Sequence, residues 1–211
     1  MDSDRLLLNF SPANGSLAFF NAIEVVSIPD GLIPERAWPI WPIEDRYMPS
    51  SFSVEIVYRI NMGGPKKYPK EDTLWRVWEP DHKYLEIKSA AQNVSIGPSF
   101  IEYKAGISVE VAPPVVYAIA QEISVNESKP NFNISWTFSL DPGFTYLVRM
   151  HFCDIVSKYL WQLRFNAYIN GQAALPDFDI SSKTGGLAVP VYEDFVFNAF
   201  AAGSDPSWVV K

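Results

Sequence analysis

The side chains that most often do chemistry in enzymes are scarce in this chain of 211 residues. His82 and His151 are its two histidines, and Cys153 is its one cysteine. A single cysteine excludes an internal disulfide and a cysteine-based zinc cluster, which needs several thiolates at short spacing. Cys153 lies in an apolar stretch, so we expect a buried thiol. A lone histidine on a strand is more often a hydrogen-bonded structural group than a catalyst, and we expect a structural role for both histidines.

The motifs of the common enzyme classes are missing from the sequence. It contains no nucleophile elbow, no glycine loop that would cradle a phosphate, and no kinase signature. Asp and Glu number 24, which leaves open a pair of carboxylates of the glycosidase type, although no spacing marks one. A metal site would need carboxylate ligands that the sequence does not group. We therefore predict a protein that is not an enzyme and needs no cofactor or metal.

One short segment of aromatic and polar residues is a candidate for ligand binding. Carbohydrate recognition pairs an aromatic platform with polar groups that fix the orientation of the sugar. The candidate ligand-binding residues are Trp75, Arg76, Trp78, Asp81 and Tyr84. For Trp75 and Trp78 the sequence favours a position in the core over ligand contact. For Asp81 and Tyr84 it gives no such reason to prefer the core.

The charge of the chain argues against nucleic acid as a partner. Lys and Arg number 17 against 24 acidic residues, which gives a formal net charge of -7 and a pI near 4.8. Binding to phosphates needs a clustered excess of basic residues. The densest basic run, Lys66, Lys67 and Lys70, is followed at once by Glu71 and Asp72 and indicates a solvated loop.

Sequons for N-glycosylation are frequent and fit a secreted glycoprotein. The predicted acceptors are Asn9, Asn14, Asn93, Asn126 and Asn133. Asn133 falls on the polar side of an alternating segment, where a glycan can be accommodated.

Alternation of apolar and polar residues predicts strands rather than helices. The expected strands are residues 54–62, 115–123, 134–140, 144–152, 162–170 and 189–200. The turn residues at 141–143 predict that the third and fourth of these form an antiparallel pair, and Asn170-Gly171 predicts a type I′ hairpin turn. With 17 prolines and 11 glycines between short apolar runs, the sequence favours an all-β fold, an antiparallel β-sandwich or its jelly-roll variant.

The flanking segments differ from this pattern. Residues 31–53 are rich in proline and tryptophan and are predicted to be a linker, whose aromatic residues Trp38, Trp41 and Tyr47 we expect to pack across a junction rather than contact a ligand. The first residues do not form a secretion signal, and no apolar stretch approaches the roughly 20 residues that span a bilayer, so we expect a soluble chain.

Several ordered motifs together indicate a family. They occupy residues 57–64 (VYRINMGG), 72–81 (DTLWRVWEPD), 141–155 (DPGFTYLVRMHFCDI) and 168–171 (YING). With these motifs the chain resembles the malectin-like ectodomains of plant receptor-like kinases of the FERONIA type, in which two malectin-like modules precede a membrane span and a kinase.

The resemblance implies a division of the chain into four parts. Residues 1–30 resemble the closing strands of a first module, 31–53 the linker, 54–200 most of a second module, and 201–211 a tail. Because the closing strands of the second module are not recognisable after residue 200, we form the hypothesis that residues 6–28 supply them.

The resemblance also implies a function in signalling at the extracellular face of the plasma membrane. The partners implied are cell-wall pectin or another glycan, and a basic secreted peptide of the rapid-alkalinisation class together with a membrane-anchored co-receptor. The sugar-binding residues of animal malectin match no motif here, and an acidic chain would repel acidic pectin but attract a basic peptide. The alternatives are a soluble remnant without a ligand and a cell-wall glycosidase.

Overall fold

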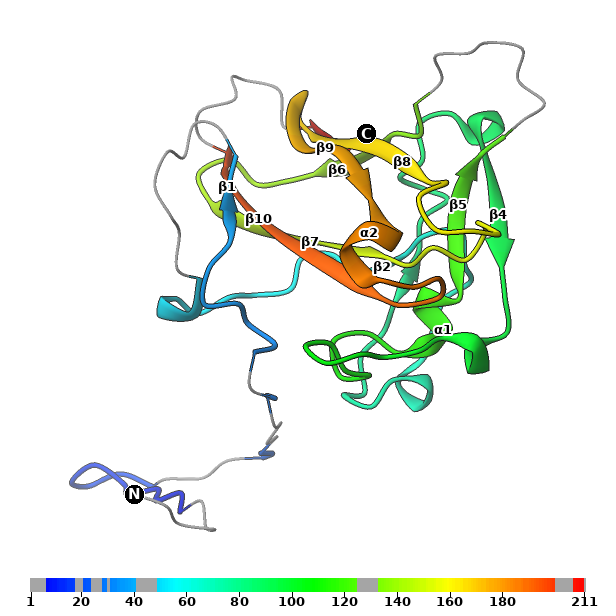
Figure 1. Cartoon of the computed structure of the whole chain (residues 1–211). Coiled ribbons are helices and arrows are strands. Elements are labelled where there is room, and N and C mark those ends of the chain that lie inside the picture. The colour runs from blue at the N-terminus through cyan, green and yellow to red at the C-terminus, as the bar shows by residue number, and fades with distance from the viewer. Residues whose placement is uncertain are drawn as a thin grey trace.

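The chain folds mostly into strands, which confirms the predicted all-β class. The computed structural model describes residues 7–17, 21–23, 28–29, 31–40, 49–124 and 133–199, and the backbone of 207–210. Two sheets and two short ribbons make up the body (Figure 1). The helices α1 (Pro114–Tyr117) and α2 (Ile180–Thr184) are short, and no helix among the described residues is long and apolar enough to cross a membrane.

The three-stranded sheet is built around strand β10 (Val191–Asn198). One edge of β10 pairs antiparallel with β7 (Thr145–Phe152), and the other pairs in parallel with β1 (Trp38–Pro39). Residues 193–197 of β10 are all buried, as expected for a strand that has neighbours on both edges and cover on both faces. Because β1 lies in the predicted linker, part of that linker belongs to the sheet.

The four-stranded sheet has the order β6-β11-β8-β9. Its strands are β6 (Trp136–Ser139), β8 (Arg164–Ile169), β9 (Gln172–Asp179) and β11 (Ser207–Val210). The hairpin between β8 and β9 turns at Asn170 and Gly171, whose φ angles of 49° and 77° are both positive, as the predicted turn requires. β11 lies between β6 and β8 and pairs with both. The prediction of a tail is therefore wrong for residues 207–210, because this β-prone run forms a strand.

The predicted pairing of residues 134–140 with 144–152 is wrong. β6 pairs with β11, whereas β7 pairs with β10 in the other sheet. The turn residues 141–143 therefore carry the chain from one sheet to the other. Tyr146, Val148 and Met150 of β7 pack on the core at the main sheets, whereas Phe138 of β6 packs on Tyr58 and Tyr84. Both strands alternate in the same way, so alternation alone did not distinguish a hairpin from such a corner.

The two ribbons correct two further strand boundaries. β2 (Ile60–Asn61) pairs in parallel with β3 (Glu79–Pro80), so the strand predicted over 54–62 is limited to its last part. β4 (Ala91–Ser95) pairs with β5 (Ile119–Ile123), and the start of the strand predicted over 115–123 is the helix α1 instead. Pro114 at the first position favours this helical turn, which is closed by a 2.9 Å hydrogen bond from the Ala118 N–H to the Pro114 carbonyl. Short 3₁₀ helices lie at Pro49–Ser51, Pro69–Glu71, Lys88–Ala90 and Pro98–Phe100.

The core has two parts. One lies at the main sheets and contains Ile40, Ile169, Phe195, Phe197 and Ala199. The other lies beneath the ribbons and contains Trp78, Ile101, Ala112, Val116, Tyr117 and Ala118, with Cys153 packed against it. Burial raises the pKa of the Cys153 thiol to about 12, so the thiol stays protonated and unreactive, as its apolar surroundings in the sequence predict.

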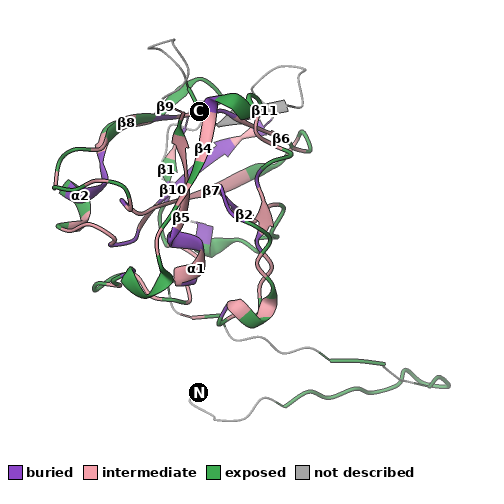
Figure 2. Cartoon of the chain, turned by 90° about the vertical axis from the view of Figure 1, so that its right-hand side faces the viewer, coloured by how far each residue is buried: buried purple, intermediate pink, exposed green. Residues whose placement is uncertain are grey.

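The described part of the N-terminal segment does not close the sandwich. Residues 7–17 and 21–23 are exposed throughout and extend away from the body (Figure 2). No strand occurs in the described part of residues 6–28, and the four-stranded sheet is completed by β11. The hypothesis that residues 6–28 supply closing strands is therefore not supported by the described residues.

Candidate binding site

The loop between β2 and β3 is held together by one buried carboxylate, Asp72. Its oxygens accept hydrogen bonds from the Leu74 N–H at 2.8 Å, from Arg76 Nε at 3.0 Å and from the Trp78 indole N–H at 2.7 Å. Burial acts to raise the pKa of Asp72, but the hydrogen bonds from Arg76 and Trp78 outweigh it and hold this pKa below its usual value. A charged Asp72 thus fixes the conformation of three of the next six residues.

Trp75 is the most exposed of the predicted ligand-binding residues. Its side chain is 76% exposed, and its φ of 55° lies in the left-handed region that a bulky residue rarely adopts. Backbone strain of this kind persists only when the surroundings impose it, and it is common at ligand-binding positions. Here the Asp72 hydrogen bonds impose it, so the loop holds an indole ring out in solvent.

Trp78 belongs to the core, as the sequence favours. Only 3% of it is exposed, and the guanidinium groups of Arg59 and Arg76 lie 5.7 Å and 5.6 Å from its ring centroid. Arg76 also donates to the Val111 carbonyl at 3.3 Å. These contacts leave Trp78 without a face that a ligand could reach.

Asp81 is buried and joins three parts of the chain. Oδ1 accepts from the Gly63 N–H at 3.1 Å, and Oδ2 accepts from Gln121 Nε2 at 3.1 Å and from the Trp136 indole N–H at 2.9 Å. Its hydrogen-bonding capacity is therefore used within the fold. Tyr84, in contrast, is half-buried against Tyr58 and keeps an accessible part.

The glycine pair of the VYRINMGG motif is explained by the same junction. Gly63 has a φ of 73°, and a Cβ built on it would lie 2.5 Å from the Ala120 carbonyl oxygen. A Cβ on Gly64 would lie 2.1 Å from the side-chain nitrogen of Asn61. Gly63 thus allows the end of β2 to approach β5 closely, and Gly64 leaves room for the side chain of Asn61.

His151 is a structural group, as the sequence predicts. Its Nδ1 lies 2.8 Å from the Tyr117 hydroxyl, and its ring packs edge-on against Trp78 at 5.7 Å. Burial lowers the pKa of His151 to about 3, so the imidazole is neutral at physiological pH. His82 is exposed. Among the described residues no group of three His, Cys, Asp or Glu side chains could hold a metal ion.

A groove that the sequence did not indicate lies between β1 and the β9–α2 segment. Its volume is about 370 Å³. Trp38 forms one wall and is 64% exposed. The expectation that it packs across a junction between two modules stays a prediction, and Trp41 and Tyr47 lie outside the described residues. The rest of the lining is Ala174, Leu175, Pro176, Asp177, Phe178, Asp179, Ser182, Lys183 and Glu193.

The lining of the groove combines apolar residues with charged groups that are mostly acidic. Asp177, Asp179 and Glu193 contribute three carboxylates against the single amine of Lys183. Lys183 Nζ lies 2.8 Å from Glu193, and Arg164, which does not line the groove, pairs with Asp177. Asp179 caps α2 by accepting the Ser182 N–H at 2.9 Å.

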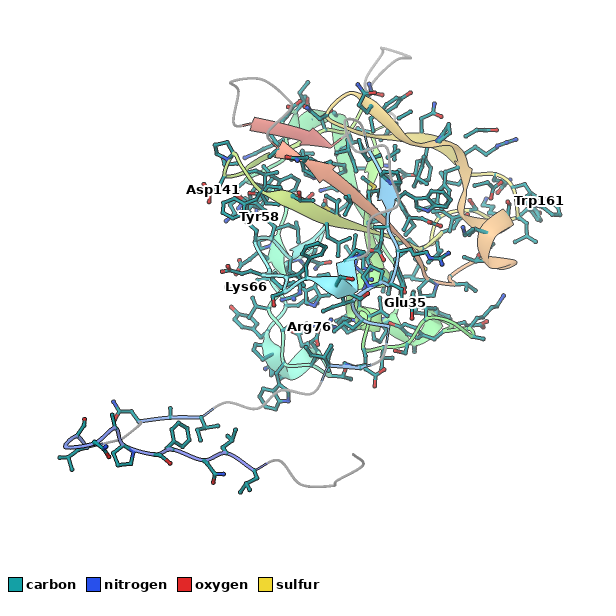
Figure 3. The ribbon with its side chains drawn as sticks, turned by 90° about the vertical axis from the view of Figure 1, so that its left-hand side faces the viewer. Glu35, Tyr58, Lys66, Arg76, Asp141 and Trp161 are labelled. Atoms are coloured by element: carbon teal, nitrogen blue, oxygen red, sulfur yellow. The ribbon has the colours of Figure 1, made fainter. Side chains whose placement is uncertain are left out.

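A further exposed tryptophan adjoins α2. Trp161 has a φ of 64°, and its backbone N–H donates to Ser181 Oγ at 2.7 Å. Figure 3 shows Trp161 at the periphery, well separated from Arg76 of the predicted cluster. The described residues thus contain two candidate binding surfaces. One is the loop around Trp75, which the sequence predicts, and the other is the groove beside Trp38, which the sequence did not indicate.

Comparison with known proteins decides the family. The model of the malectin-like domain matches residues 2–203. The chain belongs to the malectin-like family. The resemblance found in the sequence is confirmed, and because the malectin-like domain covers nearly the whole chain, no kinase domain lies within it.

Curated relatives of this malectin-like chain are plant receptor kinases. Receptor-like protein kinase THESEUS 1 of Arabidopsis thaliana is 44% identical over 203 residues, which are 96% of this chain and 24% of the relative. Receptor-like protein kinase HERK 1 of the same plant is 41% identical over 200 residues, 92% of this chain and 24% of the relative. The chain thus spans about a quarter of the length of these relatives, and the malectin-like domain model covers nearly all of the chain.

Solved malectin-like ectodomains share the fold. The plant receptor-like kinase FER is 34% identical, with a TM-score of 0.67 over 73% of this chain and 42% of that chain. FER in complex with the plant peptide RALF23 and LLG2 gives a TM-score of 0.65 at the same identity and coverage. The extracellular domain of ANXUR2 from Arabidopsis thaliana, 24% identical, has a TM-score of 0.75 over 85% of this chain and 48% of that chain.

Proposed function

We propose that this malectin-like domain is a recognition module of cell-surface signalling that binds a basic secreted peptide together with a membrane-anchored co-receptor. The observation that carries the proposal is the acidic groove beside Trp38. The relationship to FER, which has been crystallised with a peptide and LLG2, supports the same class of ligand. Such a function places the chain at the extracellular face of the plasma membrane.

The chemistry of the groove suits a peptide with basic and apolar side chains. An arginine or lysine of the peptide can replace Arg164 at Asp177 or Lys183 at Glu193, and can lie over the exposed ring of Trp38. Leu175 and Phe178 can receive an apolar side chain. The net charge of -7 speeds the approach of a cationic ligand and slows that of an anionic one.

A glycan is the second candidate ligand, and the Trp75 loop favours it. An exposed indole ring held in a strained conformation is suited to stacking on a sugar, and Arg76 and Tyr84 lie nearby in the chain. Trp78 and Asp81 are buried, and the guanidinium of Arg76 is bound to Asp72 and to the Val111 carbonyl, so Trp75 and Tyr84 remain as the proposed contacts. Because the chain is acidic, a neutral glycan fits this surface better than pectin.

A binding measurement with purified chain tests both candidates. We expect a basic peptide of the rapid-alkalinisation class to bind, more tightly in the presence of the co-receptor ectodomain, and an oligogalacturonide to bind weakly. Binding to the folded state raises the thermal midpoint by mass action. A cooperative melt that neither peptide nor glycan shifts would support the remnant without a ligand, and turnover of a wall polysaccharide would support the glycosidase.

A further inference from the structure

Glu193 places a buried carboxylate at the groove beside Trp38. It lies on β10, its side chain is 10% exposed, and it belongs to the lining of the groove. Lys183 Nζ lies 2.8 Å from Glu193 Oε1, and Glu193 makes no other ion pair or side-chain hydrogen bond among the described residues. A buried carboxylate needs a cation nearby, because taking its charge out of water is costly. Glu193 is therefore a cation-binding group, and in the free chain Lys183 is the cation.

Lys183 is not needed to hold α2 in place. The Asp179 cap fixes the start of the helix, and the carbonyls of Thr184 and Gly185 at its end accept hydrogen bonds from Lys104 Nζ at 3.1 Å and 3.3 Å. The Lys183 side chain is 55% exposed and can turn into solvent by rotation about its own bonds. An ion pair with such an exposed partner contributes little to stability. A ligand can therefore displace Lys183 from Glu193 without moving the helix.

The other two carboxylates of the groove are less suited to bind a cation of a ligand. Asp179 Oδ1 accepts hydrogen bonds from the Ser181 hydroxyl at 2.8 Å and from the Ser182 N–H at 2.9 Å, so this carboxylate is engaged in the cap of α2. The Asp177 side chain is 70% exposed, so water competes with any cation for its charge. Glu193 combines burial with a displaceable partner, and it is the carboxylate at which a cation gains most from the exclusion of water.

We propose that Lys183 occupies the position of a cationic side chain of the ligand, so that Glu193 selects an arginine or lysine of the ligand and Lys183 competes with it. This inference rests on the proposed function and deepens it, because it concerns the basic peptide at the same groove. Ammonium and guanidinium groups both donate to a carboxylate and can take this position. A ligand must first displace Lys183, so its apparent affinity is lowered according to the fraction of molecules in which the pair is closed. A peptide with a neutral residue at this position gains no such contact and binds more weakly.

Removal of Lys183 should strengthen binding of the basic peptide. Lys183→Ala should bind it about two- to fivefold more tightly, as expected when a weak competing ion pair is lost, and Lys183→Arg should bind it as the unaltered chain does. Lys66→Ala is the matched control, because it makes the same change in net charge and breaks the pair of Lys66 with Glu79, which does not line the groove. Titration calorimetry measures these affinities. If the unaltered chain binds the peptide and Lys183→Ala gains no more than Lys66→Ala, the inference is overturned while the proposed function stands.

A small cation tests the site without the peptide. n-Butylammonium should raise the thermal midpoint of Lys183→Ala, because it can take the position next to Glu193 that the lysine has left. The midpoint should rise less in Lys66→Ala and in the double variant Lys183→Ala/Glu193→Gln, in which glutamine keeps the size of the side chain but carries no charge. Equal rises in the three variants would contradict the cation site. A larger rise in Lys183→Ala, from a chain that binds no basic peptide, would support the cation site and contradict the proposed function alone.

Discussion

The Asp81 carboxylate accepts the indole N–H of Trp136 at 2.9 Å, although the two residues lie 55 positions apart. The same carboxylate accepts from Gly63 and from Gln121, so it joins the end of β2 to β5 and β6. A residue that looks accessible in the sequence is therefore a structural junction. The effect of substituting Asp81 on stability therefore depends on the three donors that it would leave without an acceptor.

We predict that Asp81→Ala lowers stability strongly. The change leaves the donors on Gly63, Gln121 and Trp136 without their acceptor, and each unsatisfied buried group costs about 1–3 kcal/mol. Chemical denaturation should show a loss of several kcal/mol. Trp75→Ala, at an exposed position, is the control and should change stability by less than about 0.5 kcal/mol. A similar small effect for both variants would show that Asp81 is not a junction.

The contrast between Asp81 and the hairpin at Asn170-Gly171 shows what the sequence could predict. The hairpin depends on two adjacent residues whose positive φ angles follow from their types, so it was predictable. The role of Asp81 depends on Gln121 and Trp136, which only the folded chain brings near. The groove has the same origin, because Trp38 meets β9 only after β1 has paired with β10. The sequence thus predicted local turns and the alternation of strands. It did not predict which polar residues are buried or which strands pair.

Trp38→Ala should separate binding from folding. The side chain is largely exposed, so its removal should change the free energy of unfolding by less than about 0.5 kcal/mol. If Trp38 is a central contact of the peptide, affinity should fall by at least about tenfold, which corresponds to about 1.4 kcal/mol. Titration calorimetry with the basic peptide measures the loss, and Trp161→Ala is the matched control. Equal affinities for the two variants would exclude the groove as the peptide site.

Stability should fall as the pH is lowered from about 6.5 towards 4.5. His151 has a pKa near 3 in the folded chain and an ordinary value of 6.5 when unfolded, so the unfolded state takes up a proton that the folded state does not. The stability from this difference is complete above pH 6.5 and is lost at up to about 1.4 kcal/mol per pH unit as the pH falls towards 3. Asp72, whose pKa is lowered from 3.8, acts in the same direction but only at lower pH.

The His151→Gln variant checks this assignment. Glutamine can keep a hydrogen bond to the Tyr117 hydroxyl but does not titrate. The variant should be less stable than the unaltered chain at pH 7, yet its free energy of unfolding should change less between pH 6.5 and 4.5. Parallel pH profiles for the two chains would assign the acid sensitivity to other groups.

Glycans should occupy Asn93 and Asn133 when the chain is produced with a secretion signal. Both residues are exposed, Asn93 on β4 and Asn133 shortly before β6. Asn9 and Asn14 are also exposed and should be occupied, whereas Asn126 lies outside the described residues. Mass spectrometry of glycopeptides before and after enzymatic deglycosylation measures occupancy, and Asn93→Gln should remove one glycan without a loss of stability. An unmodified Asn133 in secreted protein would contradict the prediction for that site.

Gly63→Ala should be far more harmful than Gly171→Ala. Both glycines have positive φ angles, of 73° and 77°, so both substitutions carry a similar backbone strain of roughly 1 kcal/mol. The two positions differ in the room available for a Cβ atom. A Cβ at Gly63 would lie 2.5 Å from the Ala120 carbonyl oxygen, whereas a Cβ at Gly171 would have nothing within 4 Å. The clash forces β2 away from β5 and weakens the hydrogen bond from the Gly63 N–H to Asp81, which adds about 1–3 kcal/mol. Denaturation midpoints measure both variants: Gly171→Ala reports backbone strain alone, and Gly63→Ala reports strain together with the clash. Equal losses of stability would mean that the close approach of Gly63 to β5 contributes nothing to the fold.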